Sequence, residues 1–407
     1  MKLISAIVPN RIKHWHSVMR QKQFIRNLAS IGRKRIKPSG DDVVLVFIAG
    51  GLGDYIASLP SLKSIGASTP DCVLVCPPHM CGFPQLHNEV SHLFTKVIEW
   101  DFYTHWTSTR TGWEATLNQI NKYRVQKIYK LGPVTTYALE LFISAFTNVP
   151  KYTFVSIYRS VFKNGFVVFD PRFGDKKYAL CLKDLDPLVT YHGIQRRFLV
   201  ATNIPLASYE NDFCKIPPSS KLLPSLPYFC IQFNPSFDYR QPRLGILLDL
   251  VDFLLAEKGW HFVAMGSANP QLSRVLTSKY GDAFTDYLGK TSFDDYMSLI
   301  NNASLVISAD TSAAHLANAF HVPSLVFCTR MFGASLFPCD WGFGALHQAI
   351  VQVRTPCSYC AFIDTDCEEI AERKQCQLNN QKPICVDAYS SIEALSALRE
   401  LLNNCCQ

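Results

Sequence analysis

The chain has 407 residues, of which 48% are hydrophobic, and a formal net charge of +7. This composition excludes an intrinsically disordered protein, and the length exceeds what one hydrophobic core usually organises, so two domains are expected. No apolar run approaches the ~18 residues of a membrane-spanning helix, and the first residues lack the apolar segment of a secretory signal.

The positive charge is concentrated at the beginning of the chain. Residues 1–38 contain ten Lys or Arg and no acidic residue, which leaves the rest with a net charge of −3. Apolar residues recur through this segment at loosely helical spacing. We interpret residues 1–40 as a basic amphipathic extension that binds an anionic membrane surface, with a solvated, frayed extension as the alternative. Nucleic acid is not an expected partner, because the remaining chain is not basic and contains no recognised binding module.

A strand–turn–helix unit follows the extension. Val43–Ala49 is an apolar run typical of a buried strand, a glycine-rich turn comes next, and residues 55–65 have helical spacing. This order is that of the first unit of a doubly wound sheet, in which Gly51 and Gly53 would let the backbone approach a ligand. Asp54 would lie just beyond the carboxyl end of the strand, where open α/β sheets bind ligands; a helix N-cap is its alternative role.

Strands and helices alternate through both halves of the chain. In the first half, strands are predicted at 72–76, 97–100 and 127–131, and helices at 114–123 and 136–146. The proline- and serine-rich segment 216–227 is typical of an interdomain linker. After it, strands are predicted at 228–233, 261–265, 305–308 and 324–328, and helices at 244–257, 271–279 and 293–301. We therefore expect an α/β fold with one domain at 41–220 and a second at 221–388, facing each other across a cleft.

The most informative stretch is Asp310 to Pro323, an alanine-rich segment between two apolar runs. Asp310, Thr311 and Ser312 should lie where a buried strand ends and a helix begins. At such a junction, backbone N–H groups and the positive end of the helix dipole favour phosphate binding. We interpret it as the site of a nucleotide-sugar diphosphate; the alternative is an ordinary helix N-cap with His315 facing the core.

The fifteen cysteines are scattered, and most lie in or beside apolar runs. This distribution is typical of buried thiols in a reducing cytosol, not of a disulfide framework. The exception is a C-x-x-C pair followed by further cysteines, a spacing that predicts a structural iron or zinc site; free thiols in a compact loop are the alternative. The candidate ligands, in the segment 357–385, are Cys357, Cys360, Cys376 and Cys385, with Cys367 as an alternate.

With these segments placed, the chain resembles glycosyltransferase family 9, the lipopolysaccharide heptosyltransferases. Residues 53–60, Gly-Asp-Tyr-Ile-Ala-Ser-Leu-Pro, are similar to the family's G-D-x-x-x-x-L-P, and residues 310–317 to its D-T-G-x-x-H-L-A block. Residues 234–242 loosely resemble the loop that ends in K-x-W-P. Two positions depart from the family: Ser312 stands at its glycine and Arg240 near its lysine. The acidic ribose-binding residue that relatives carry after the equivalent of residues 265–267 is not evident either.

The resemblance implies a GT-B fold of two Rossmann-like domains, inversion at the sugar carbon, and no metal or other cofactor for catalysis. Asp54 would take the proton of the acceptor hydroxyl, and a helix within residues 389–407 would pack back on the N-terminal domain. The donor-binding residues would lie on the second domain, and comprise Ser236, Arg240, Met265, Gly266, Asp310, Thr311, Ser312 and His315.

The expected function is transfer of heptose from ADP-heptose to a lipopolysaccharide core or similar acceptor. The protein would be cytoplasmic and peripheral on the inner face of the inner membrane. Two alternatives stay open: the same fold acting with another nucleotide-sugar or on a protein acceptor, and a catalytically silent nucleotide-sugar-binding or assembly protein.

Overall fold

The structure is a computed structural model that describes most of the chain between residues 39 and 405. The described residues are 39–82, 84–101, 106–131, 139, 142–143, 145–146, 149–153, 199, 203–205, 222–233, 240–328, 347–353 and 388–405; within them, the side chains of 84–86 and 106–112 are not described. The basic extension, Ser236 and the cysteine segment 357–385 lie outside these residues.

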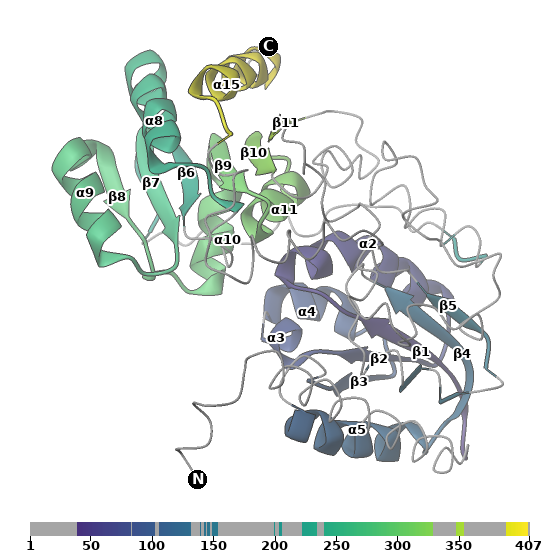
Figure 1. The fold of residues 1–407 in the computed structure, drawn as a ribbon. Coiled ribbons are helices and arrows are strands. Elements are labelled where there is room, and N and C mark those ends of the chain that lie inside the picture. Colours follow the sequence, from purple (N-terminus) through teal and green to yellow (C-terminus); the bar gives the residue numbers. More distant parts are fainter. Residues whose placement is uncertain are drawn as a thin grey trace, which may run out of the picture.

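The N-terminal lobe is built on a five-stranded parallel sheet (Figure 1). Its strands, in spatial order, are β3 (Lys96–Glu99), β2 (Cys72–Cys76), β1 (Asp42–Ile48), β4 (Arg124–Leu131) and β5 (Lys151–Thr153). Its helices are α2 (Leu52–Ser68), α3 (Pro78–Cys81), α4 (Pro84–Ser91) and α5 (Trp106–Ile120). Alternate residues of β1 pack into two different clusters, one with α2 and one with α5, so the sheet is buried on both faces. Apolar runs without polar alternation are what such strands require.

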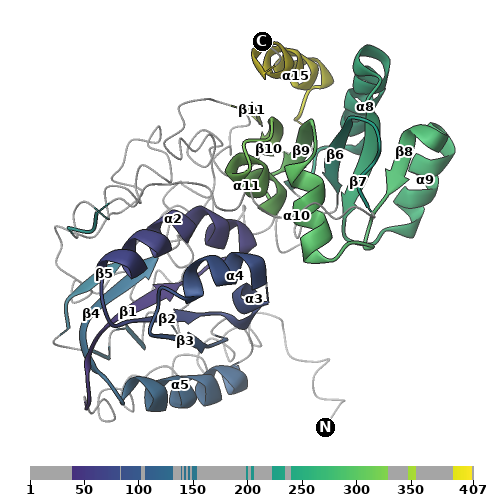
Figure 2. The same ribbon diagram turned by 180° about the vertical axis from the view of Figure 1, so that it is seen from behind.

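The C-terminal lobe repeats this plan with a six-stranded parallel sheet (Figure 2). The strand order is β11 (Gln348–Gln352), β10 (Ser324–Cys328), β9 (Leu305–Ala309), β6 (Tyr228–Phe233), β7 (His261–Gly266) and β8 (Phe284–Asp286). Its helices are α8 (Leu244–Lys258), α9 (Pro270–Tyr280), α10 (Phe293–Asn301), α11 (Ser312–Ala319) and α15 (Ser391–Cys405). The predicted strands at 72–76, 228–233 and 324–328 and the helix at 293–301 match the structure in both bounds.

Local sequence signals set several of the helix ends. Ser292 caps α10 together with Asp295, each side chain accepting a hydrogen bond from the other residue's backbone N–H. Gly259 ends α8 with φ +63°, a left-handed conformation that costs glycine little. The start of α10 and the end of α8 are therefore set by residues that satisfy or accommodate the helix terminus.

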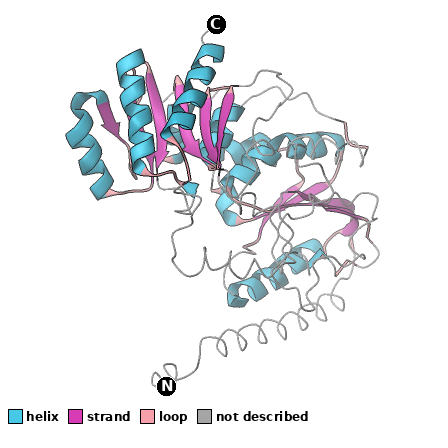
Figure 3. Ribbon diagram, turned by 45° about the horizontal axis from the view of Figure 1, so that its top comes forward, coloured by secondary structure: helices cyan, strands magenta, loops and turns pink. Residues whose placement is uncertain are grey.

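Each sheet has one point at which the strand order reverses. In the N-terminal lobe the reversal falls between β1 and β4, and in the C-terminal lobe between β6 and β9. Figure 3, coloured by secondary structure, shows helices on either side of each sheet. Ligands of open parallel sheets bind beyond the carboxyl ends of the strands at such a point. The predicted α/β class with two doubly wound sheets is confirmed, and each sheet provides one ligand position.

The C-terminal helix lies elsewhere than expected. The buried residues of α15, among them Leu398 and Leu402, belong to the core of the C-terminal lobe and lie against α8, β10 and β11. The expectation that this helix packs back on the N-terminal domain is wrong for the described residues. The physical reason is its apolar face, which covers the C-terminal sheet beside α8 and leaves no buried stripe for the other lobe.

Candidate active site

Asp54 stands at the start of α2, directly after the turn that follows β1. Its Oδ2 atom accepts a hydrogen bond of 2.8 Å from the backbone N–H of Gly51, the residue that caps the helix. The chain reaches this position through Gly50, whose φ is +144°. A Cβ on Gly50 would lie 2.3 Å from the Cβ of Asp54, so only glycine fits. The turn thus holds the carboxylate by backbone shape as well as by a hydrogen bond.

The glycines of this turn differ in whether a side chain would fit in their place. Gly51 has φ −86°, and an added Cβ would come no closer than 4.0 Å to Asp54, so another residue fits there. Gly53 is different, because an added Cβ would lie 2.6 Å from Cδ2 of His315 in the other lobe. The sequence prediction named Gly51 and Gly53; the structure assigns the steric need to Gly50 and Gly53.

Asp310 and Thr311 form the opposing rim, between the end of β9 and the start of α11. Arg240, which lies between β6 and α8 in the sequence, contacts this rim. Arg240 Nη1 donates a 2.7 Å hydrogen bond to the carbonyl oxygen of Asp310 and lies 3.7 Å from its carboxylate. Thr311 caps α11 by accepting a hydrogen bond from the N–H of Ala313, and its hydroxyl lies 2.8 Å from that of Ser308. A guanidinium beside the N-terminus of a helix is an arrangement that attracts an anion.

Ser312 and His315 complete the first turn of α11. The hydroxyl of Ser312 lies 3.5 Å from that of Tyr296 on α10, so the side chain that replaces the family's glycine is directed toward that helix. His315 is buried, and burial lowers its pKa to about 4, an effect that Asp310 opposes and Arg240 reinforces. At neutral pH the ring is therefore uncharged, and it packs directly against Gly53 of the N-terminal lobe.

The two rims act on each other electrostatically. Burial raises the pKa of Asp54 to about 6. The hydrogen bond from Gly51 opposes that rise, Asp310 adds to it, and Arg240 and Lys130 lower the pKa. Since Arg240 and Asp310 belong to the other lobe, the structure brings the predicted N-terminal and C-terminal site residues together.

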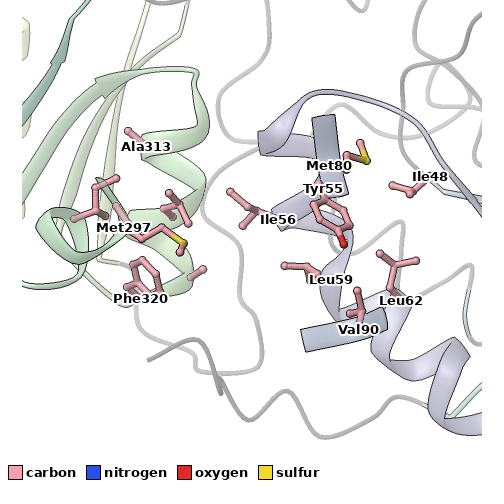
Figure 4. Close-up of a cluster of buried hydrophobic side chains, with 14 of the residues drawn as sticks. Ile48, Tyr55, Ile56, Leu59, Leu62, Met80, Val90, Met297, Ala313 and Phe320 are labelled. Atoms are coloured by element: carbon pink, nitrogen blue, oxygen red, sulfur yellow. The ribbon is translucent and has the colours of Figure 1, made fainter. Parts of the chain in front are cut away.

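Apolar side chains hold the lobes in this arrangement. One continuous cluster includes Ile56 and Leu59 of α2 together with Leu316 and Phe320 of the α11 segment. In Figure 4, Ile56 points from α2 toward Met297 and Ala313 of the C-terminal lobe, so the start of α2 is fixed beside that of α11.

The structure adds two residues that the sequence analysis missed. Lys130, the penultimate residue of β4, is fully buried and pairs in register with Phe47 of β1, next to the Asp54 turn. A charged residue inside the apolar run 128–131 was the signal, since a buried lysine needs a compensating anion.

Gln232 lies near the end of β6; its Nε2 donates to the carbonyl of Phe233, and its buried Oε1 has no partner among the described residues.

Gly266 and Met265 end β7, next to this glutamine. Gly266 has φ +126°, and a Cβ there would lie 2.0 Å from the carbonyl oxygen of Phe233, so the backbone is in contact with β6. The side chain of Met265 is fully buried in the core, so only its backbone can reach a ligand.

This arrangement can perform a displacement between two substrates. Asp54 can take a proton from a hydroxyl group on the N-terminal side, because a carboxylate with a pKa of about 6 is largely ionised at pH 7 yet basic enough to accept. Arg240 and the start of α11 can neutralise a departing anion on the other side. His315, held neutral by burial, adds no charge to the site.

Comparison with known proteins connects the C-terminal rim to a family. Residues 251–331 match the model of glycosyltransferase family 9 (heptosyltransferase). The matched segment contains Gly266, Asp310, Thr311 and His315, so the family resemblance is confirmed over the segment that carries most of the C-terminal rim. No curated protein sequence matches the chain.

Solved structures match the chain over most of its length. A glycosyltransferase family 9 protein from Veillonella parvula is 14% identical, with a TM-score of 0.58, over 89% of this chain and 97% of that chain. Escherichia coli heptosyltransferase WaaC with ADP-2-deoxy-2-fluoro heptose is 14% identical, with a TM-score of 0.51, over 82% and 99%. Escherichia coli ADP-heptose lipopolysaccharide heptosyltransferase II is 14% identical, with a TM-score of 0.50, over 88% and 98%. These similarities establish the fold, and the expected GT-B architecture is confirmed.

Several predicted features fall outside the described residues. They include Ser236, the basic extension, and the cysteines at 357, 360, 367, 376 and 385. Within the part of the chain that the structure describes, no helix combines the length and apolar character needed to cross a membrane.

Proposed function

We propose that this protein is an inverting, metal-independent glycosyltransferase that moves heptose from ADP-heptose to a lipopolysaccharide core or related acceptor. The observation that carries the proposal is the position of Asp54 opposite Arg240 and the start of α11, each at the ligand-binding edge of its own sheet. The family match over residues 251–331 supports transfer of a sugar from a nucleotide donor.

Asp54 serves as the base in this mechanism. It accepts the proton of the acceptor hydroxyl as that oxygen attacks the anomeric carbon, and the bond to the diphosphate breaks on the opposite face. The anomeric carbon is inverted because a single displacement occurs. Burial supports this role, since it raises the pKa of Asp54 to about 6 and thereby makes the carboxylate a stronger base than an exposed one.

Arg240, Thr311 and Ser312 stabilise the leaving nucleoside diphosphate. Negative charge accumulates on the diphosphate as the sugar departs, and a guanidinium with backbone N–H groups at a helix start neutralises it. The Arg240 fork is held by the carbonyl of Asp310, so little reorganisation is needed at the moment of reaction. Gln232 and the backbone of Gly266 are placed to receive the nucleoside end of the donor.

ADP-heptose is the proposed donor because two of the structural relatives are heptosyltransferases, one named for ADP-heptose and one solved with its 2-deoxy-2-fluoro analogue. The basic segment 1–40 would hold the enzyme at the anionic inner face of the inner membrane, where a lipid-linked acceptor is available. Removing residues 1–38 should then reduce binding to phosphatidylglycerol vesicles, measured by co-sedimentation; unchanged binding would refute the membrane role.

The experiment that tests the function measures donor binding and turnover separately. Thermal shift against ADP-heptose, ADP-glucose, UDP-glucose and ADP should show the largest stabilisation with ADP-heptose. Transfer to a heptose-deficient lipopolysaccharide core should release ADP with the wild type but at background rate with Asp54→Asn. Equal, negligible release by both proteins, with donor binding retained, would support the alternative of a silent binding protein.

A further inference from the structure

Two free thiols lie in contact beside the active-site turn. Cys76 is the last residue of β2 and Cys81 the last residue of α3, and their sulfur atoms are 3.3 Å apart. A disulfide bond places its sulfurs about 2.05 Å apart, so a movement of little more than one ångström would join them.

The two thiols differ in exposure and acidity. Cys76 is fully buried, whereas Cys81 is partly exposed. The hydrogen bond between the sulfurs raises the pKa of Cys76, and burial adds to that rise. The same bond lowers the pKa of Cys81, against the opposing effects of burial and of Glu99. An oxidant would therefore react first with Cys81, which is the more acidic and more accessible sulfur. The Cys76 sulfur is already in contact with it.

We propose that Cys76 and Cys81 form a reversible disulfide and are a redox modification site of this protein. A peroxide is the oxidant class. The Cys81 thiolate attacks one peroxide oxygen, the O–O bond breaks, and Cys81 becomes a sulfenic acid while hydroxide leaves. The Cys76 sulfur then attacks the Cys81 sulfur, the S–O bond breaks, and water leaves. Two thiols lose two electrons and two protons, and one peroxide becomes two waters. A dithiol reverses the reaction by exchange.

The pair is connected to Asp54 through α3. His79, between the two cysteines in sequence, places its Nε2 atom 3.1 Å from the carbonyl oxygen of Gly50. Gly50 is in turn packed against Asp54. Because α3 has only four residues, we infer that drawing Cys81 toward Cys76 also shifts His79 relative to Gly50. Oxidation is thus expected to disturb the turn that holds the catalytic carboxylate and to slow sugar transfer, a consequence that rests on the proposed function.

The disulfide is tested by peptide mass, which does not depend on any activity. Residues 64–96 contain no Lys or Arg before Lys96, so trypsin releases Cys72, Cys76 and Cys81 on one peptide. After treatment of the full chain with hydrogen peroxide and alkylation, this peptide should carry one alkyl group, on Cys72, and weigh two hydrogens less. Three alkyl groups after oxidation, or a bond that includes Cys72, would overturn the proposal.

Matched variants separate the pair from its neighbour on the same peptide. Cys72→Ala should still form the disulfide, because Cys72 lies at the other end of β2. In Cys76→Ser, whose hydroxyl can still donate a hydrogen bond to Cys81 but cannot form a disulfide, Cys81 should accumulate as a sulfenic acid trapped by dimedone. Absence of that adduct in a variant that melts like the wild type would contradict the assignment of Cys81 as the attacking thiol.

The link to the active site has its own readout. Oxidised wild type should transfer sugar at least tenfold more slowly and recover with dithiothreitol, whereas Cys76→Ala should keep its rate under the same brief treatment. An unchanged rate in protein shown to carry the disulfide would overturn the link to Asp54 and leave the modification site standing. If no transfer is found under any condition, the proposed function fails, and the peptide masses still decide the disulfide.

Discussion

In the N-terminal lobe the helix at the ligand edge, α2, begins with a carboxylate, whereas in the C-terminal lobe α11 begins with a neutral hydroxyl. Asp54, in the first turn of α2, accepts a hydrogen bond from the N–H of the capping residue Gly51, whereas Thr311 caps α11 by accepting from Ala313. The dipole of α2 therefore already faces a negative group of its own chain. The α11 dipole faces a neutral oxygen, with Arg240 beside it. The same strand order thus places a carboxylate at the ligand edge of one lobe and a hydroxyl beside an arginine at that of the other.

Replacing Asp54 by Asn removes the carboxylate of that contrast and should have the largest effect on the rate of sugar transfer. The amide can still accept from Gly51, so the turn is expected to keep its shape, but it cannot take a proton. Transfer should fall by about 10³, in line with the loss of a general base. The measurement is ADP release under saturating donor. A loss below about tenfold would show that Asp54 is not the base.

The same substitution slows transfer but should increase the stability of the folded protein. Burial raises the pKa of Asp54 from its ordinary 3.8 to about 6 in the folded state. The fold therefore favours the protonated form, and stability falls as pH rises from about 4 through about 6. Asp54→Asn should raise the free energy of unfolding at pH 7.5 by at most about 3 kcal/mol and change it little at pH 4, as measured by urea denaturation. Equal effects at both pH values would contradict the raised pKa.

Replacing Arg240 tests the anion side of the comparison and should have the second largest effect. Arg240→Ala removes the charge at the start of α11 and should slow transfer by about 10², with weaker ADP binding. Arg240→Lys should recover part of this loss, because it restores the charge but not the fork. Arg274→Ala, on the exposed face of α9, is the control and should transfer normally. Similar losses for Arg240→Ala and this control would argue against a specific role.

The contact between the lobes can be broken by one methyl group. Gly53→Ala would place its Cβ 2.6 Å from the His315 ring, and the resulting overpacking should slow transfer about tenfold and lower the Tm. Gly51→Ala adds the same methyl group where there is space and should stay near wild type. In the Gly53→Ala, His315→Ala double variant the Tm should partly recover, as the ring that clashes is gone. Additive losses in a double-mutant cycle would show that the two residues do not touch.

Lys130 tunes the base and should give the smallest effect. Asp54 must be ionised to act, so transfer should rise with pH through about 6. Lys130 lowers the pKa of Asp54, and Lys130→Gln should therefore move the midpoint of the rate–pH profile upward. Lys127→Gln, a more exposed residue on the same strand, is the control and should leave the midpoint in place. A downward movement for Lys130→Gln would contradict the proposed electrostatics.

The central strands of both sheets were predictable from sequence because they are apolar throughout. Cys72–Cys76 and Ser324–Cys328 are buried at every position, which is the pattern that parallel strands produce. The edge strands β5, β8 and β11 were missed because they mix polar with apolar residues, as Phe284–Asp286 does; β5 and β8 also have only three residues each. The packing of α15 was also missed, because an apolar helix face does not indicate which sheet it will cover.

The site could be predicted where local sequence encodes it and not where tertiary packing does. Asp54 and Thr311 lie at strand-to-helix junctions, which apolar periodicity locates along the chain. Lys130 lies on β4, beside β1, and Gln232 lies on β6, beside β7. Their positions in the site depend on strand register, which only the folded sheet defines. The steric demand on Gly50, in place of Gly51, follows from a φ value that composition does not reveal.

The apolar seam between α2 and α11 has a consequence for how the chain can be divided. Cutting the backbone between residues 205 and 222 would yield two fragments, each with its own sheet. Ile56 on one fragment and Leu316 on the other would then be left facing water. Each fragment expressed by itself should self-associate through its exposed apolar surface, and mixing the two fragments should restore a soluble heterodimer. Such a split pair would serve as a reporter whose reassembly rebuilds the whole enzyme.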